Sequence, residues 1–161
     1  MSEALVVILM GSAADRDHAA KVAASVEGFG IEAVQRVGSA HKTPEHVLDL
    51  LRTYEQDGRP KVYVTIAGRS NALSGFVDGT VSSPVIACPP PSDAFGGADL
   101  FSSIRMPSDV APMLVLDPAN AGLAAAKILA VADPVLRERI AAHKTTEAAK
   151  VTIADRELHD G

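Results

Sequence analysis

The sequence predicts an α/β protein, a single-domain three-layer αβα sandwich around a central parallel sheet, as in flavodoxin-like and Rossmann-like folds. Its 161 residues suit one compact core. The segment 4–10, "ALVVILM", is continuously apolar and rich in branched residues, which is typical of a strand covered on both faces. Similar runs then alternate with helical patterns, and this order favours parallel strands joined by right-handed crossovers.

The first strand–helix unit follows directly from this run. Four apolar residues recur at helical spacing after the loop "GSAAD": Ala19, Val22, Ala23 and Val26. Gly28 and Gly30 should end that helix. In the second unit, residues 31–37 form the strand and "GSAHK" the loop. Thr43 is the expected N-cap and Pro44 the first helical residue. Its buried stripe is expected at Val47, Leu50, Leu51 and Tyr54.

The remaining units are shorter and less regular. Strands are expected at residues 61–67, 84–87 and 112–116, a Gly-interrupted helix near residues 72–79, and a further helix at residues 98–106. Two closing helices should follow, the first Ala-rich and the second polar. The whole chain, 1–161, is then one domain, with 133–161 as its C-terminal helix and tail. The small residues of "NAGLAAAKILA" suit close helix packing, either between subunits or inside one chain.

Three loops should meet at the carboxyl edge of the sheet. These are "GSAAD", "GSAHK" and "AGRSN", each directly after a predicted strand. Ligands of open parallel sheets bind beyond that edge, near the point where the strand order reverses. A strand order of 2-1-3-4-5 would make the three parent strands neighbours and bring the loops together.

Composition excludes several classes of function. Fifteen Lys and Arg residues against 20 Asp and Glu residues give a net charge of −5, and no basic cluster tracks a phosphate backbone, so we expect no nucleic-acid partner. No apolar stretch approaches a membrane span and no secretory leader is evident, so we expect no membrane association and a cytoplasmic location. The one cysteine, Cys88, reads as a small core residue. No metal is inferred from the spacing of His, Cys and carboxylates.

The first loop has the features of an anion site. Ser12 and nearby backbone N–H groups precede a helix, whose positive end attracts phosphate. Asp15 would repel a phosphate, so its expected role is to accept hydrogen bonds from ligand hydroxyls, such as a ribose diol. The alternative is that Ser12 or Asp15 only caps the helix.

The second loop carries a candidate base. His41 lies just before a helix whose positive end, together with Lys42, favours a neutral imidazole that can accept a proton. The alternative is a structural or merely exposed loop histidine. The other histidines, His18, His46, His143 and His159, are expected at the surface or behind the site.

The third loop offers donors to a carboxylate. These are the Gly68 backbone, Arg69 and the Ser70 hydroxyl, with the Asn71 amide beside them. Arg69 could instead pair with a local Asp or Glu. The later segment "ACPPPSDAFGG" combines rigid prolines with a Gly-Gly hinge, which indicates a lid or a subunit contact.

Five motifs in order carry a family resemblance. They are "LMGSAAD", "SAHKTPEH", "AGRSNALSGF", "ACPPPSDAFGGADLFSSIRMPS" and "NAGLAAAKIL". Over residues 5–129 the chain resembles the phosphoribosylaminoimidazole carboxylase (PurE) family. One class of that family is a mutase whose third loop resembles "GAGGAAHLPG", with a second histidine. This chain has no histidine between His46 and His143, so it resembles class II, which carboxylates aminoimidazole ribonucleotide with carbon dioxide directly.

The resemblance implies a role for each loop. Ser12 and amides around Gly11 would hold the phosphate, Asp15 the ribose, and Ser39 and Lys42 the substrate as a whole. His41 would move the proton, and Gly68, Arg69 and Ser70 would stabilise the forming carboxylate. It also implies no cofactor, neither ATP nor biotin, and a homo-oligomer, commonly an octamer.

Two residues depart from the family pattern, and two other functions stay open. Ala14 stands where a serine is usual, and Asp109 replaces a common glycine, a change that Asp tolerates if φ is positive. The mutase of the same family is one alternative function. A non-catalytic phosphate or nucleotide sensor on the same sheet is the other.

Overall fold

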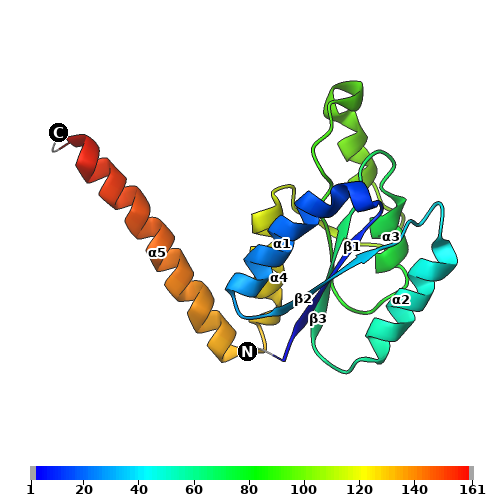
Figure 1. The fold of residues 1–161 in the computed structure, drawn as a ribbon, viewed down its shortest axis with the longest axis horizontal. Helices are drawn as coiled ribbons and strands as arrows, with labels where there is room; N and C mark the ends of the chain where they lie inside the picture. Colours follow the sequence, from blue (N-terminus) through cyan, green and yellow to red (C-terminus); the bar gives the residue numbers. More distant parts are fainter. Residues whose placement is uncertain (1–2, 160–161) are drawn as a thin grey trace.

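A five-stranded, fully parallel sheet forms the centre of the computed structural model, which describes residues 3–159 (Figure 1). Its order is β2-β1-β3-β4-β5, so the condition for the three loops to converge is met. The strands are β1 (Leu5–Met10), β2 (Glu32–Val37), β3 (Lys61–Ile66), β4 (Val85–Ala87) and β5 (Met113–Leu114).

Helices cover both faces of this sheet, which confirms the predicted three-layer fold (Figure 1). The α-helices within residues 3–159 are α1 (Arg16–Gly28), α2 (Pro44–Gln56), α3 (Ala72–Asp78), α4 (Pro118–Leu129) and α5 (Pro134–His159). Two 3₁₀ segments are η1 (Ala13–Asp15) and η2 (Ala94–Ser103). The predicted stripes of α1 and α2 are buried, apart from a half-buried Tyr54.

The continuous apolar run of β1 serves two separate cores. Successive side chains of a strand point to opposite faces. Val6, Ile8 and Met10 therefore pack with α1 and α4, whereas Leu5, Val7 and Leu9 pack with α2 and α3. This division explains why β1 has no polar positions, since neither of its faces meets water.

The small-residue face of α4 lies inside the chain and packs on α1. Ala121, Gly122, Ala125 and Ala126 are buried there. A Cβ built on Gly122 would lie 2.5 Å from the Ser25 Cβ and 3.0 Å from the Val22 carbonyl oxygen. This close contact decides between the two interpretations of "NAGLAAAKILA": the face packs within one subunit.

Two elements differ from their predicted form. The helix expected at residues 98–106 is the kinked 3₁₀ segment η2, with left-handed backbone at Phe95, Gly96 and Gly97. Adjacent serines have low helix propensity, and Pro107 disfavours helical backbone before it, so an α-helix is not sustained there. The strand expected at residues 112–116 shortens to two paired residues in β5.

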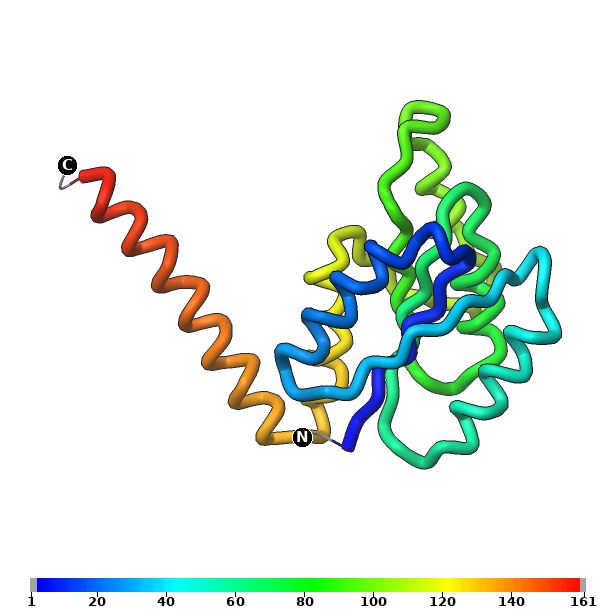
Figure 2. Tube along the Cα trace, viewed as in Figure 1, coloured from blue at the N-terminus to red at the C-terminus, as the bar shows by residue number. Residues whose placement is uncertain are grey.

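The last helix leaves the body of the molecule (Figure 2). Leu136 and Ile140 of α5 are buried, and the His143 ring meets Phe29 edge-on at 5.2 Å between centroids. Every described residue from Ala141 to His159 is exposed. The expected tail is thus helical as far as His159. Across residues 3–159, none of the helices is long and apolar enough to cross a membrane.

Candidate active site

All eight residues that the sequence singled out line one cavity. It has a volume of about 700 Å³ and lies beyond the carboxyl ends of the strands. The segment after β1 contributes Ser12 and Asp15. The loop after β2 contributes Ser39, His41 and Lys42, and the loop after β3 contributes Gly68, Arg69 and Ser70. Strand order explains the convergence, because β1 pairs directly with both β2 and β3.

The first loop is hydrogen-bonded to the sheet through one N–H group, and other N–H groups of the loop remain available. The Gly11 N–H donates to the Ile66 carbonyl at 2.8 Å, so this amide is not available to a ligand. The Ser12 Oγ accepts from the Ala14 N–H at 3.2 Å and so caps η1. Ser12 is therefore a helix cap, as the alternative interpretation predicted, and it also lines the cavity. Asp15 makes no capping hydrogen bond, and burial raises the pKa of its carboxyl.

The second loop is a tight turn that presents two side chains. The Ser39 Oγ accepts from the Lys42 N–H at 3.3 Å, and the Thr43 Oγ1 accepts from the Ser39 N–H at 3.0 Å. Thr43 occupies the predicted N-cap position, but its hydroxyl serves this turn and bonds no N–H of α2. His41 and Lys42 are exposed, and within residues 3–159 their side chains make no hydrogen bond or ion pair.

The third loop has an unusual backbone. Arg69 has a φ of 59°, in the left-handed region that non-glycine residues rarely adopt. No salt bridge of the described chain includes Arg69, so the predicted alternative of a local acidic partner is not seen. The N–H groups of Gly68, Arg69 and Ser70 also have no partner among residues 3–159. Three backbone donors thus remain available at the cavity.

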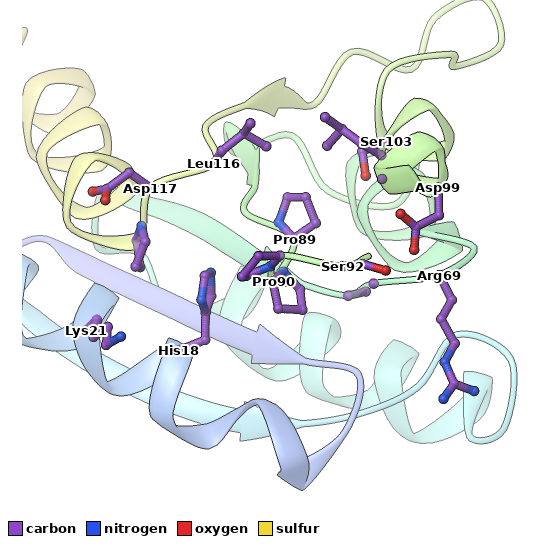
Figure 3. A pocket seen from close by; sticks show the side chains of 16 residues that line it. His18, Lys21, Arg69, Pro89, Pro90, Ser92, Asp99, Ser103, Leu116 and Asp117 are labelled. Atoms are coloured by element: carbon purple, nitrogen blue, oxygen red, sulfur yellow. The ribbon is translucent and has the colours of Figure 1, made fainter. Parts of the chain in front are cut away.

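A second cavity of about 550 Å³ adjoins the first (Figure 3). The two share a wall formed by the loop after β3 and by the loop after β4, including Pro90, Pro91 and Ser92. Sequence reasoning missed these three residues as lining residues, although their loop leaves a strand at the same edge. In Figure 3 the Arg69 side chain points away from the group formed by His18, Lys21 and Asp117.

Two side chains beside the second cavity interact, and the sequence did not predict their contact. His18 Nε2 lies 3.4 Å from the Cys88 Sγ. Burial, followed by the charge of Lys21, lowers the pKa of His18, while burial and Asp117 raise the pKa of the buried Cys88 to about 12. Both groups are thus held neutral near pH 7, and the thiol is a core group, as predicted. His18, expected at the surface or behind the site, is half-buried and lines the second cavity.

The two departures from the family pattern each have a local structure. The Ala14 N–H bonds the Ser12 hydroxyl, so this position contributes its amide to the loop. Asp109 has a φ of 63°, which explains why glycine suits this position and why Asp can replace it. In the described part of the chain, no group of three or more His, Cys, Asp and Glu side chains could hold a metal ion.

The fold and this cavity are typical of an α/β enzyme, with the Ser12 loop, an exposed histidine and free backbone donors at one sheet edge. The family model for AIR carboxylase matches residues 5–150. The chain therefore belongs to the AIR carboxylase family, carboxylases of purine biosynthesis.

Individual relatives agree with this assignment. The chain is 54% identical over 154 residues to the phosphoribosylaminoimidazole carboxylase of Treponema denticola, covering 96% of this chain and 97% of that protein. It is 56% identical over 152 residues to that of Archaeoglobus fulgidus, covering 94% and 83%. A crystal structure of Treponema denticola PurE superposes with a TM-score of 0.95 at 54% identity, covering 96% of this chain and 98% of that one.

Proposed function

We propose that this enzyme carboxylates 5-aminoimidazole ribonucleotide with carbon dioxide, reversibly, to give 4-carboxy-5-aminoimidazole ribonucleotide, without ATP or biotin. One observation carries the proposal. A single cavity brings together the Ser12 loop, His41 and the free N–H groups at Gly68–Ser70. These are an anion site, a proton acceptor and a set of donors, which are the three parts that the reaction needs.

The substrate would lie across the three loops. Its phosphate would meet the Ser12 hydroxyl and the N–H groups of Ser12 and Ala13, which have no protein partner among residues 3–159. Asp15 would accept hydrogen bonds from the ribose hydroxyls. Ser39 and Lys42 would fix the orientation of the ring. Holding both reactants in contact can contribute about 7–11 kcal/mol to lowering the barrier.

The chemistry would then follow from the enamine character of the aminoimidazole. Its ring carbon attacks carbon dioxide, a carbon–carbon bond forms, and one carbon–oxygen π bond becomes the carboxylate. The ring carbon still carries its hydrogen, and His41 removes that proton, so the ring regains aromaticity. Gly68, Arg69 and Ser70 donate hydrogen bonds to the carboxylate oxygens as negative charge develops on them.

The absence of a second histidine supports direct use of carbon dioxide. His41 is the one histidine among the described residues that line this cavity. The third loop of this chain contains Arg69 and Ser70, whereas the corresponding loop of the mutase class resembles "GAGGAAHLPG". A mutase must both release the carboxyl group and recapture it. We assign that additional task to the second histidine of the mutase class.

The proposal includes a homo-oligomer, an octamer by analogy with the family, and a cytoplasmic location. An isolated helix shorter than about 12–15 residues is marginal in water, and the exposed part of α5 is little longer. Val151 and Leu158, seven residues apart, are 71% and 85% exposed. A second copy of this chain would cover that apolar stripe.

The deciding experiment compares two substrates at matched concentrations. One is aminoimidazole ribonucleotide with bicarbonate as the source of carbon dioxide, and the other is its N-carboxylated form. We expect turnover of the first, without added ATP. Turnover of only the carbamate would assign the chain to the mutase class. Binding of the ribonucleotide without turnover of either substrate would indicate the sensor.

A further inference from the structure

We propose that Ser102, which lies outside both cavities, is a positioning residue that holds the Gly68–Ser70 loop in its active shape. The inference rests on the proposed carboxylation, because it assigns a purpose to donors that this reaction requires. Its basis is a set of hydrogen bonds between η2 and the third loop.

A single hydroxyl closes the loop around Ser70. The Ser102 Oγ donates to the Arg69 carbonyl at 2.9 Å and accepts from the Asn71 N–H at 3.0 Å. The hydroxyl thus bridges the peptide groups on either side of Ser70. It uses both its donor and an acceptor site, so it fixes the distance between these two groups.

The bridge holds a conformation that is strained by itself. Arg69 has a left-handed φ of 59°, and a side chain with a Cβ adopts this region only when its surroundings impose it. Its carbonyl is the group that Ser102 restrains. Without the hydroxyl, residue 69 can relax toward negative φ, and the peptide planes that carry the free N–H groups would rotate.

A buried network separate from the bridge holds the Asn71 side chain. The Asn71 Nδ2 donates to the Ser103 Oγ at 2.8 Å, and the Asn71 Oδ1 accepts from the Ser74 Oγ at 2.8 Å. The Ser74 and Thr65 hydroxyls are also 2.8 Å apart. All four residues are buried, so this hydrogen-bond chain joins η2 through the third loop to β3.

The two serines of η2 therefore have separable roles, which gives a matched pair of variants. The Ser102 hydroxyl bonds the backbone of the loop, whereas within residues 3–159 the Ser103 hydroxyl bonds the side chain of Asn71 and not the loop backbone. Ser103 is 2% exposed and the more buried of the two, so its loss should affect stability at least as much.

The test measures kcat and KM for aminoimidazole ribonucleotide together with thermal stability. We expect Ser102→Ala to lower kcat at least tenfold while KM changes less than threefold, because the phosphate and ribose contacts remain. Ser103→Ala should keep kcat within threefold of the parent although its melting temperature falls at least as far. Ser102→Thr, which keeps the hydroxyl, should recover most of kcat.

The results separate this inference from the proposed function. A parent protein that does not carboxylate the ribonucleotide contradicts the proposed function itself. An active parent with an unchanged kcat in Ser102→Ala overturns the positioning role, and so does an equal loss of kcat in Ser103→Ala. If Ser102→Ala does not fold, Ser102→Cys decides in the same way, since it keeps the size of the side chain and weakens both hydrogen bonds.

Discussion

His41 is the residue on which the proposed chemistry depends most directly. We expect His41→Asn to lower turnover by about 100-fold or more, because the amide cannot take up the proton of the carboxylated ring. Binding of the ribonucleotide, measured by calorimetry, should change only a few-fold. His46→Asn is the matched control: its ring bonds the Val37 carbonyl at 3.2 Å outside the cavity, and turnover should be kept. A variant at position 41 within tenfold of the parent would contradict the role of the base.

A second residue-scale prediction concerns stability in acid. Hydrogen bonds from Arg59 lower the pKa of Asp57 to about 2, below its ordinary value of 3.8. A carboxyl with a lowered folded-state pKa stabilises the fold above its unfolded pKa and loses this contribution as the pH falls. Melting temperatures of the parent and of Asp57→Asn should therefore differ at pH 7 and converge between about pH 4 and pH 2.

The control for this prediction is another aspartate with an arginine partner. Asp49 pairs with Arg52 at 3.1 Å one turn away on the exposed face of α2. Such surface pairs contribute little, so Asp49→Asn should show a small difference with no convergence on acidification. A constant gap between Asp57→Asn and the parent from pH 7 to pH 2 would contradict the assignment.

The cavity residues that could be predicted are those that the local sequence places in a loop after a strand. Ser12, His41 and Arg69 each follow a recognisable strand, and their side chains suit a ligand at that edge. His18 could not be predicted as a cavity residue, because its partner Cys88 lies 70 positions away and meets it only through the folded sheet. The φ of Arg69 was equally hidden, since hydrogen bonds from a distant segment impose it.

At the scale of elements, the packing of α4 on α1 gives a prediction that opposes helix propensity. Alanine in place of a helical glycine normally stabilises by up to about 1 kcal/mol. At Gly122 the new methyl group would lie within 2.5 Å of the Ser25 side chain and 3.0 Å of a carbonyl, and such overpacking typically costs about 1–3 kcal/mol. Gly122→Ala should therefore lower the free energy of unfolding measured in urea.

Gly28 provides the comparison for this substitution. It ends α1, and a Cβ added there would meet nothing within 4 Å. Gly28→Ala should leave stability unchanged or raise it slightly. Equal effects of the two substitutions would show that the contact between α1 and α4 is looser than described.

Long, strongly patterned elements could be predicted, and so could the short β4 and α3, whereas the form of η2 and the length of β5 could not. The stripe of α2 and the apolar run of β1 are fixed by local periodicity, which burial of each face rewards directly. The bounds of η2 depend on hydrogen bonds between its serines and the third loop. β5 is limited to two residues by its pairing with β4, and neither constraint is visible in the local sequence.

At the scale of the whole molecule, α5 is the element whose exposed length has no explanation within a single chain. It has 26 residues, or about 39 Å of helix, and its residues from Ala141 to His159 are exposed (Figure 2). If the chain forms the proposed homo-oligomer, replacing both Val151 and Leu158 by Asp should lower the mass measured in sedimentation experiments, because two charges would enter the proposed contact. Thr152→Asp, on another side of the helix, should leave the mass unchanged. An unaltered mass for the double variant would remove α5 from the assembly.

The strand order has a consequence for how the sheet comes apart. β1 pairs directly with both β2 and β3, and these three strands carry the loops of the cavity, whereas β5 adds two residues at the margin beyond β4. Opening of a native sheet begins where the fewest contacts hold it. Fraying from the β5 side would therefore leave the Ser12, His41 and Ser70 loops anchored, so early thermal breathing is directed away from the chemistry.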